Sequence, residues 1–190
     1  SELIVKLDRY MFEHACRWYR IHLERGGSPV SLAVNVSKAG LFQNDFEDFY
    51  TDIKDKYSVP DGVLELEFTE SILAADTELF AELVVNLNAR GFICSLDDFG
   101  SGYSSLNLLK NLPIDVLKLD ILFFHKSRDI RRERIVVSNV INMARELNIK
   151  TIAEGVEDMD TVEFLRKAGC NVIQGYVFAK PCLRRILNIC

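Results

Sequence analysis

The sequence has no long apolar run, no paired-cysteine motif and no signal-peptide pattern at its start. A transmembrane helix needs about 18 or more consecutive apolar residues, so no membrane span is expected within the chain. The five cysteines are odd in number and form no CxxC pair. We therefore expect reduced, mostly buried thiols rather than disulfides or a zinc site, and a cytoplasmic protein or cytoplasmic domain.

Histidine and net positive charge are also scarce. The three histidines (His14, His22 and His125) are scattered and none lies at a predicted strand end, which argues against histidine catalysis. A formal charge of −5 argues against a nucleic-acid polymer as partner, because such binders carry a basic surface. The 190 residues, 48% hydrophobic and 27% charged, predict a single soluble domain over residues 1–190.

Polar residues end each of six short apolar or β-branched runs. The runs are LAVNVS with Asn35, LELEFTES with Glu67 and Glu70, CSLDDFG with Asp97 and Asp98, VLKLD with Lys118 and Asp120, TIAEGVE with Glu154 and Glu157, and VIQGYVF with Gln174. Barrel enzymes build their sites in this way, with the carboxyl ends of the strands converging on one face.

Strands and helices alternate along the chain, which predicts parallel βα units. The predicted strands are 31–36, 63–69, 92–98, 115–120, 150–154 and 171–177. The predicted helices are 6–25, a helical region near 38–57, 71–90, a short helix near 104–111, a helix ending about Leu147, 159–168 and one after Pro181. In the first helix, Leu7, Tyr10, Met11, Ala15 and Trp18 recur at helical spacing.

Two α/β architectures fit this alternation, an open doubly wound sheet and a closed ring. An open sheet draws its ligand groups from only some strands, whereas here every strand end is polar, which favours the ring. Only six units are visible, and an eight-stranded barrel typically needs about 250 residues. We therefore expect a (β/α)8 TIM-type barrel that is incomplete at the N-terminus of this chain.

The strand-end side chains offer oxygen ligands without sulfur or imidazole. They are Asn35, Glu67, Asp97, Asp98, Glu154 and Gln174. Such a set suits Mg²⁺, Mn²⁺ or Ca²⁺, and two ions would relieve the repulsion among the carboxylates. Paired ions suit in-line displacement at phosphorus. The alternative is that each acid is a helix N-cap or a solvated loop residue, which is a fair account of any one of them but a poor account of the whole set.

Strand alternation in VLKLD places Lys118 opposite Leu117 and Leu119. If the leucines pack against helices, the lysine points into the barrel and can position or deprotonate a water, although it could also be a counter-ion to Asp97 or Asp98.

The glycine-rich loop after Asp98 could be a mobile cover, with Glu70 accepting its hydrogen bonds.

At these residues the chain resembles the EAL family of bacterial cyclic-di-GMP phosphodiesterases. The matching segments are NVS at 35–37, EFTES at 67–71, DDFGSGYSSL at 97–106, LKLD at 117–120, AEGVE at 153–157 and QGYVFAKP at 174–181. The resemblance implies a (β/α)8-type barrel with one reversed strand. It also implies Mg²⁺- or Mn²⁺-assisted hydrolysis of cyclic-di-GMP to linear pGpG.

The resemblance also implies roles for individual residues. Metal would be held by Asn35, Glu67, Asp97 and Glu154, with Asp98 at a second ion. Lys118 would contact or activate the attacking water. Substrate contacts and the water network would involve Asp98, Gly100, Ser101, Gln174 and Glu157, while Glu70 would anchor the 99–105 loop. Cyclic-di-GMP is thus the expected ligand, and a homodimer or fused sensory or GGDEF domains outside this chain are compatible with this assignment.

The chain departs from the family pattern in one respect. The Glu-Ala-Leu motif and the arginine that follows it are absent, so we expect them upstream of Ser1 and expect the 190 residues alone to be impaired. Two rival interpretations stay open. One is a catalytically inactive relative that binds the dinucleotide or a protein partner and acts as a signalling module, and the other is a barrel enzyme for a different phosphate ester.

Overall fold

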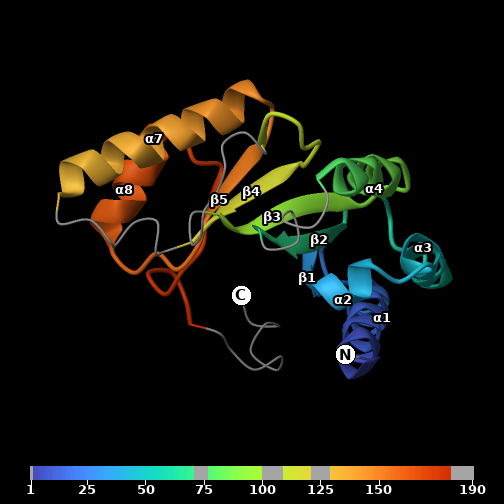
Figure 1. Ribbon diagram of the computed structural model, residues 1–190. Helices are drawn as coiled ribbons and strands as arrows, with labels where there is room; N and C mark the ends of the chain where they lie inside the picture. The colour runs from blue at the N-terminus through green and yellow to red at the C-terminus, as the bar shows by residue number, and fades with distance from the viewer. Residues whose placement is uncertain (1, 71–76, 100–108, 121–128, 181–190) are drawn as a thin grey trace. The chain divides into compact units, whose positions relative to one another are not determined.

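The computed structural model describes residues 2–70, 77–99, 109–120 and 129–180. Within them, parallel strands alternate with helices, as the sequence predicts (Figure 1). The chain forms two compact units, Ser1–Leu117 and Lys118–Cys190. The helix predicted after Pro181 and most of the one near 104–111 lie outside the described residues.

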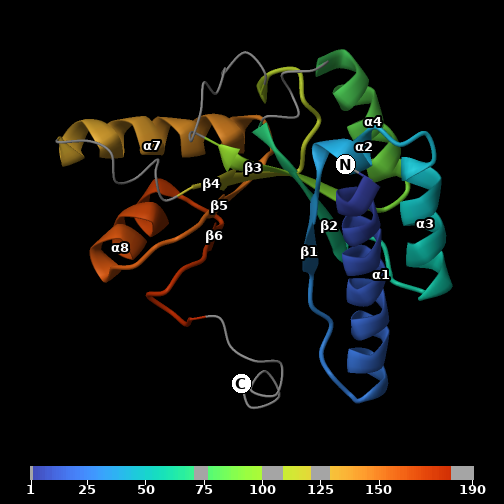
Figure 2. The same ribbon diagram turned by 60° about the horizontal axis from the view of Figure 1, so that its bottom comes forward.

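The first unit contains three parallel strands in chain order, each bonded to the next. Its elements are α1 (Glu2–Glu24), β1 (Leu32–Val36), α2 (Lys38–Leu41), α3 (Phe46–Lys56), β2 (Leu64–Thr69), α4 (Thr77–Ala89) and β3 (Ile93–Phe99). Figure 2 shows α1 running alongside β1, and the helix also packs against α2 and α3. The helical region predicted near 38–57 is therefore two helices, separated by a short connection.

One face of β2 supplies the centre of this unit's core. Leu64, Leu66 and Phe68 alternate along the strand and are fully buried. Phe80 of α4 meets Phe68 edge-on, with 5.2 Å between the ring centroids. Side chains at every second position of a strand share a face, so the intervening residues Glu65 and Glu67 point to the opposite side of the sheet.

The residues that α1 buries are not the apolar residues from which the helix is predicted. The buried residues are Asp8, Phe12, Cys16 and Tyr19, which recur every three to four positions. Leu7, Tyr10 and Met11 are exposed instead. An apolar stripe at helical spacing predicts a helix but does not identify its packed side when both sides carry apolar residues.

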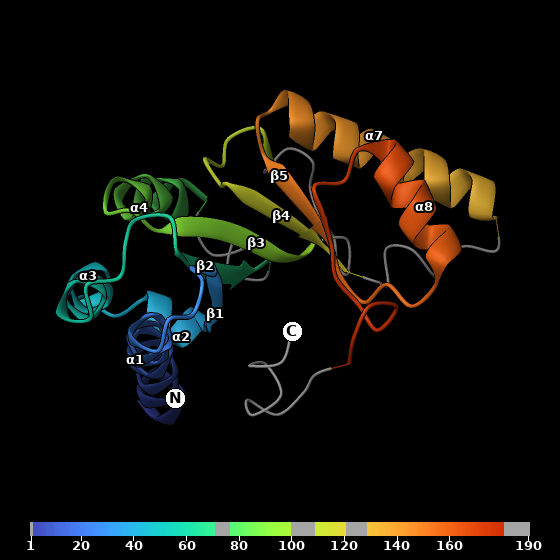
Figure 3. The same cartoon turned by 180° about the vertical axis from the view of Figure 1, so that it is seen from behind.

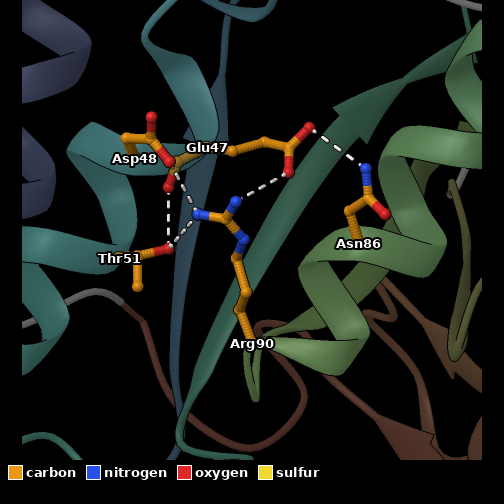
Figure 4. Close-up of polar contacts among 5 residues, drawn as sticks. All are labelled: Glu47, Asp48, Thr51, Asn86 and Arg90. Atoms are coloured by element: carbon orange, nitrogen blue, oxygen red, sulfur yellow. Dashed lines mark hydrogen bonds and ion pairs between the residues drawn. The ribbon is translucent and has the colours of Figure 1, made fainter.

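Arg90 joins α3 to the end of α4 (Figure 4). Its guanidinium lies 3.0 Å from an Asp48 carboxylate oxygen and 3.4 Å from one of Glu47, and it donates to the Thr51 hydroxyl at 3.2 Å. Asn86 donates to the other Glu47 oxygen at 3.3 Å. This network links α3 to the C-terminal end of α4.

The second unit continues the same alternation. Its elements are β4 (Val116–Leu119), whose first two residues end the first unit, α7 (Ile130–Glu146), β5 (Lys150–Ala153), α8 (Met159–Ala168) and β6 (Val172–Ile173). Helix α7 packs against α8 and β5, and Figure 3 shows the two helices side by side. Asp129 and Asp158 cap α7 and α8 through their side chains, which explains where each helix begins.

In the part of the chain that the structure describes, no helix has the length and apolar character required to span a bilayer.

Most of the described cysteines are buried, as the sequence predicts. Cys16 and Cys94 are buried and Cys170 is partly exposed, and all three are free thiols. Cys182 and Cys190 lie outside the described residues. Burial raises the pKa of Cys16 to about 12 and raises the pKa of Cys94 still further.

We expect Cys16 and Cys94 to resist alkylation by iodoacetamide at pH 8 and to react once urea unfolds the protein. The thiolate is the reactive form, and burial limits both its formation and its access. Peptide-level mass spectrometry of the two states measures the labelling. Rapid native labelling of Cys16 would contradict the packing described for α1.

Candidate active site

The parallel register places three predicted ligands on one face of the first unit. Asn35 of β1 is the register partner of Glu67 in β2, and Glu67 is the partner of Ser95 in β3. Asp97 lies two residues beyond Ser95 and therefore shares its face. Asn35, Glu67 and Asp97 thus occupy the same side of three adjacent strands, close to their carboxyl ends.

These three side chains differ in their access to water. Asn35 is exposed, Asp97 is half-buried, and Glu67 is only 6% exposed to solvent. A carboxylate this buried is costly unless it is paired or hydrogen-bonded. The donor set is all oxygen, which fits a hard divalent cation such as Mg²⁺ or Mn²⁺. Among the described residues, no three His, Cys, Asp or Glu side chains form a ready-made metal cluster.

Asp98 has a backbone conformation that few residues other than glycine adopt. Its φ is +58°, in the left-handed region, and its amide donates to Asp97 Oδ1 at 2.9 Å. Aspartate tolerates this conformation better than most side chains. The left-handed residue interrupts strand alternation, so Asp97 and Asp98 need not point to opposite faces. No feature of the sequence predicts this conformation.

Lys118 and Glu154 form an ion pair within the second unit. Lys118 Nζ lies 2.7 Å from Glu154 Oε1, and the lysine side chain is only 8% exposed. Glu154 immediately follows β5, and its amide donates to the carbonyl of Leu119 in β4 at 2.9 Å. The pairing of β4 with β5 therefore positions both charges. Sequence reasoning placed Lys118 opposite the leucines but did not identify Glu154 as its partner.

The segments after β5 and β6 are bonded to each other through their backbones. Val156 donates to the Gln174 carbonyl and accepts from the Val177 amide, both at 3.1 Å. These bonds bend the chain away from the strand path, so β6 stops at Ile173 rather than near residue 177 as the sequence predicts. They also bring the segment with Gln174 beside the one with Glu157, and both of these side chains are exposed.

Gly175 permits this close backbone approach. A Cβ atom at that position would lie 2.0 Å from the Val156 carbonyl oxygen and 2.3 Å from its nitrogen. Both obstructing atoms belong to the backbone and cannot rotate away. The sequence predicts a loop here, but the contact itself depends on the path of the folded chain.

Three predicted residues involve the segment after β3. Gly100 and Ser101 lie outside the described residues, and so does most of the 99–105 loop that Glu70 is expected to anchor. Glu70 itself directly follows β2. Phe99, which ends β3, is buried. The roles expected for Gly100, Ser101 and Glu70 stay predictions.

The two units thus define an α/β protein whose strand ends carry oxygen ligands and a buried lysine–carboxylate pair. The model of one family, described as the EAL domain, matches residues 1–181, and the chain belongs to that family. The resemblance proposed from its motifs is confirmed.

Curated relatives match this chain over one part of much longer proteins. The bifunctional diguanylate cyclase/cyclic di-GMP phosphodiesterase MucR of Pseudomonas aeruginosa is 35% identical over 179 residues, which cover 94% of this chain and 26% of the relative. The cyclic di-GMP phosphodiesterase NbdA of the same organism is 35% identical over 180 residues, covering 94% and 23%. The chain spans about a quarter of the length of these relatives.

Solved EAL structures share the fold. The P. aeruginosa MucR phosphodiesterase, solved as a complex with c-di-GMP, has a TM-score of 0.88 and 35% identity over 98% of this chain and 75% of that chain. The EAL domain of Mycobacterium smegmatis DcpA has a TM-score of 0.87 and 32% identity, covering 95% and 82%. The predicted fold class, an α/β barrel of the TIM type, is confirmed by these neighbours.

We expect Gly175→Ala to lower the free energy of unfolding by about 2 kcal/mol, the usual range for overpacking a tight site. Gly169→Ala is the matched control in the same unit. It places a residue at φ +87° but brings its Cβ no closer than 3.5 Å to another group, so backbone strain should cost about 1 kcal/mol. Urea denaturation measures both variants. A smaller loss for Gly175→Ala than for Gly169→Ala would contradict the close approach.

Proposed function

We propose that this chain belongs to a phosphodiesterase domain that, as the complete domain, hydrolyses cyclic-di-GMP to linear pGpG with the help of Mg²⁺ or Mn²⁺. The observation that carries the proposal is the register of β1, β2 and β3, which gives Asn35, Glu67 and Asp97 a common face in a chain of the EAL family. The names of the relatives, which are cyclic di-GMP phosphodiesterases, support the substrate.

In this proposal the oxygen ligands divide between two cations. Asn35, Glu67, Asp97 and Glu154 would hold one, and Asp98 would contribute to the second. Bound cations would neutralise charge that develops on the phosphodiester and would favour water as the nucleophile. The left-handed backbone at Asp98 supports its separate role, because backbone strain is most often retained where a function requires it.

Lys118 orients the attacking water in this mechanism. Its ammonium group, held 2.7 Å from Glu154, can donate a hydrogen bond to the water oxygen and fix its approach to phosphorus. The water oxygen forms the new bond to phosphorus as one ring P–O bond breaks, which opens the cyclic dinucleotide to pGpG. Gln174, Glu157, Gly100 and Ser101 would contact the substrate or its waters, and Glu70 would anchor the loop after β3.

Chromatographic analysis of the products that the complete domain forms from cyclic-di-GMP, with Mg²⁺ or Mn²⁺ and with excess EDTA, tests the proposal. Conversion to pGpG that EDTA abolishes is expected. Tight binding of cyclic-di-GMP without turnover would contradict the enzymatic role and assign the protein to the non-catalytic signalling class.

We expect Lys118→Ala to lower kcat by a factor on the order of 10², the range for losing a group that positions or transfers a proton. KM should change less, because the proposed contact is to water rather than to the dinucleotide. Lys54→Ala is the control, since Lys54 is also buried and ion-paired, with Asp61, but lies in α3. It should reduce stability and leave kcat of the folded protein unchanged. Near-normal turnover by Lys118→Ala would remove this lysine from the mechanism.

Replacing Glu67 by Gln should weaken Mg²⁺ or Mn²⁺ binding by at least about tenfold while the fold is retained. The amide occupies nearly the same volume but lacks the negative charge that a hard cation prefers. Isothermal titration calorimetry measures the affinity, and circular dichroism checks the fold. Glu65→Gln, two residues earlier on the same face, is the control. Unchanged affinity in Glu67→Gln would exclude this carboxylate from the metal site.

A further inference from the structure

Asp8 is a carboxylate on the buried face of α1. It is 9% exposed, and the rest of the buried stripe consists of Phe12, Cys16 and Tyr19. An ionisable group in such surroundings is expensive unless its oxygens accept hydrogen bonds. An apolar side chain would pack there at lower cost, so the contacts of Asp8 indicate what the carboxylate does.

Asp8 bonds to the turn that follows β1. Its Oδ2 accepts hydrogen bonds from the Ser37 hydroxyl at 2.5 Å and from the Ser37 amide at 3.1 Å. The same hydroxyl oxygen accepts from the Gly40 amide at 3.1 Å and caps α2. A Cβ at position 40 would lie 2.7 Å from Asp8 Oδ2, so the absence of a side chain at Gly40 leaves room for the carboxylate. Asp8, Ser37 and Gly40 form a connected cluster, which we call the α1–β1 clamp.

The α1–β1 clamp lies two residues beyond Asn35. Val36, between Asn35 and Ser37, is buried against the opposite face. The α1–β1 clamp therefore fixes the backbone just after Asn35, where the chain leaves β1.

We infer that Asp8 is a positioning residue for Asn35, and through it for the divalent-cation site, although it lies on a helix and outside the six strand-end motifs. This inference rests on the proposed function, because Asn35 matters here as a cation ligand. Replacing a group that orients a metal ligand without touching the metal commonly lowers metal affinity by about 10–100-fold. Asp8 does so by holding backbone rather than by touching the ligand side chain.

The test is Mn²⁺ binding to the protein, followed through the electron paramagnetic resonance signal of free Mn²⁺, without substrate. Asp8→Ala should weaken Mn²⁺ binding by about tenfold. Asp8→Asn, whose amide oxygen can still accept from Ser37, should restore most of that affinity. Arg9→Ala is the matched control on the same helix. It removes the ion pair with Asp45 but leaves the α1–β1 clamp intact, so Mn²⁺ affinity should be unchanged.

Asn35→Ala separates this inference from the proposed function. If Asn35→Ala binds Mn²⁺ as tightly as the unaltered protein, the proposed ligand set is wrong whatever Asp8 does. If Asn35→Ala binds weakly, adding Asp8→Ala to it should cause little further loss, because the two residues act through one ligand. Losses that simply add, or native affinity in Asp8→Ala, would overturn the positioning role.

Asp8→Ala could also disturb the packing of α1, so Ser37→Ala provides a second test of the α1–β1 clamp. It removes the hydroxyl from the α1–β1 clamp and leaves the Asp8 side chain and the Ser37 amide bond in place. An intermediate loss of Mn²⁺ affinity with an intact cooperative melt is expected. If Asp8→Ala does not fold and Ser37→Ala binds Mn²⁺ normally, Asp8 has a structural role only and the inference fails.

Discussion

The parallel register of β1, β2 and β3 is the constraint on which the candidate site depends. Side chains alternate between the two faces of a strand, so a slip of one residue would transfer Glu67 to the helix-facing side and bring Phe68 to the site. Burial of Leu64, Leu66 and Phe68, the last against Phe80 of α4, opposes that slip. The apolar core of the first unit therefore selects which polar groups reach the site face.

Much of the fold could be predicted because strands and helices leave strong local signals. Helix 159–168 is found with the predicted bounds, and five of the six strands begin and end within about a residue of expectation. The stripe that α1 buries could not be predicted, because Leu7 and Met11 are as apolar as the residues that are packed. The early end of β6 depends on hydrogen bonds to Val156, which is distant in sequence and leaves no local signal.

The chemical character of the site was more predictable than its contacts. Carboxylates after apolar runs identify strand ends, and parallel strands direct those ends to one edge, so the set of candidate ligands follows from pattern alone. The contact between Lys118 and Glu154 does not follow, since Asp97, Asp98 and Glu154 all lie at strand ends. The hydrogen bond from the Glu154 amide to the Leu119 carbonyl sets Glu154 beside β4, and this contact leaves no local signal in the sequence.

Burial of charge alone does not identify function, as the two buried lysines among the described residues demonstrate. Lys54 donates to Asp61 and to the carbonyl of Arg90 at the end of α4, where a cation also complements the helix dipole. That arrangement stabilises a helix end and needs no further explanation. Lys118 lies on β4, whose other residues are apolar and buried, and its ammonium group is paired with Glu154. An apolar residue of similar volume would fill the position at lower desolvation cost, so its retention beside Glu154 is better explained by chemistry at the strand ends than by stability.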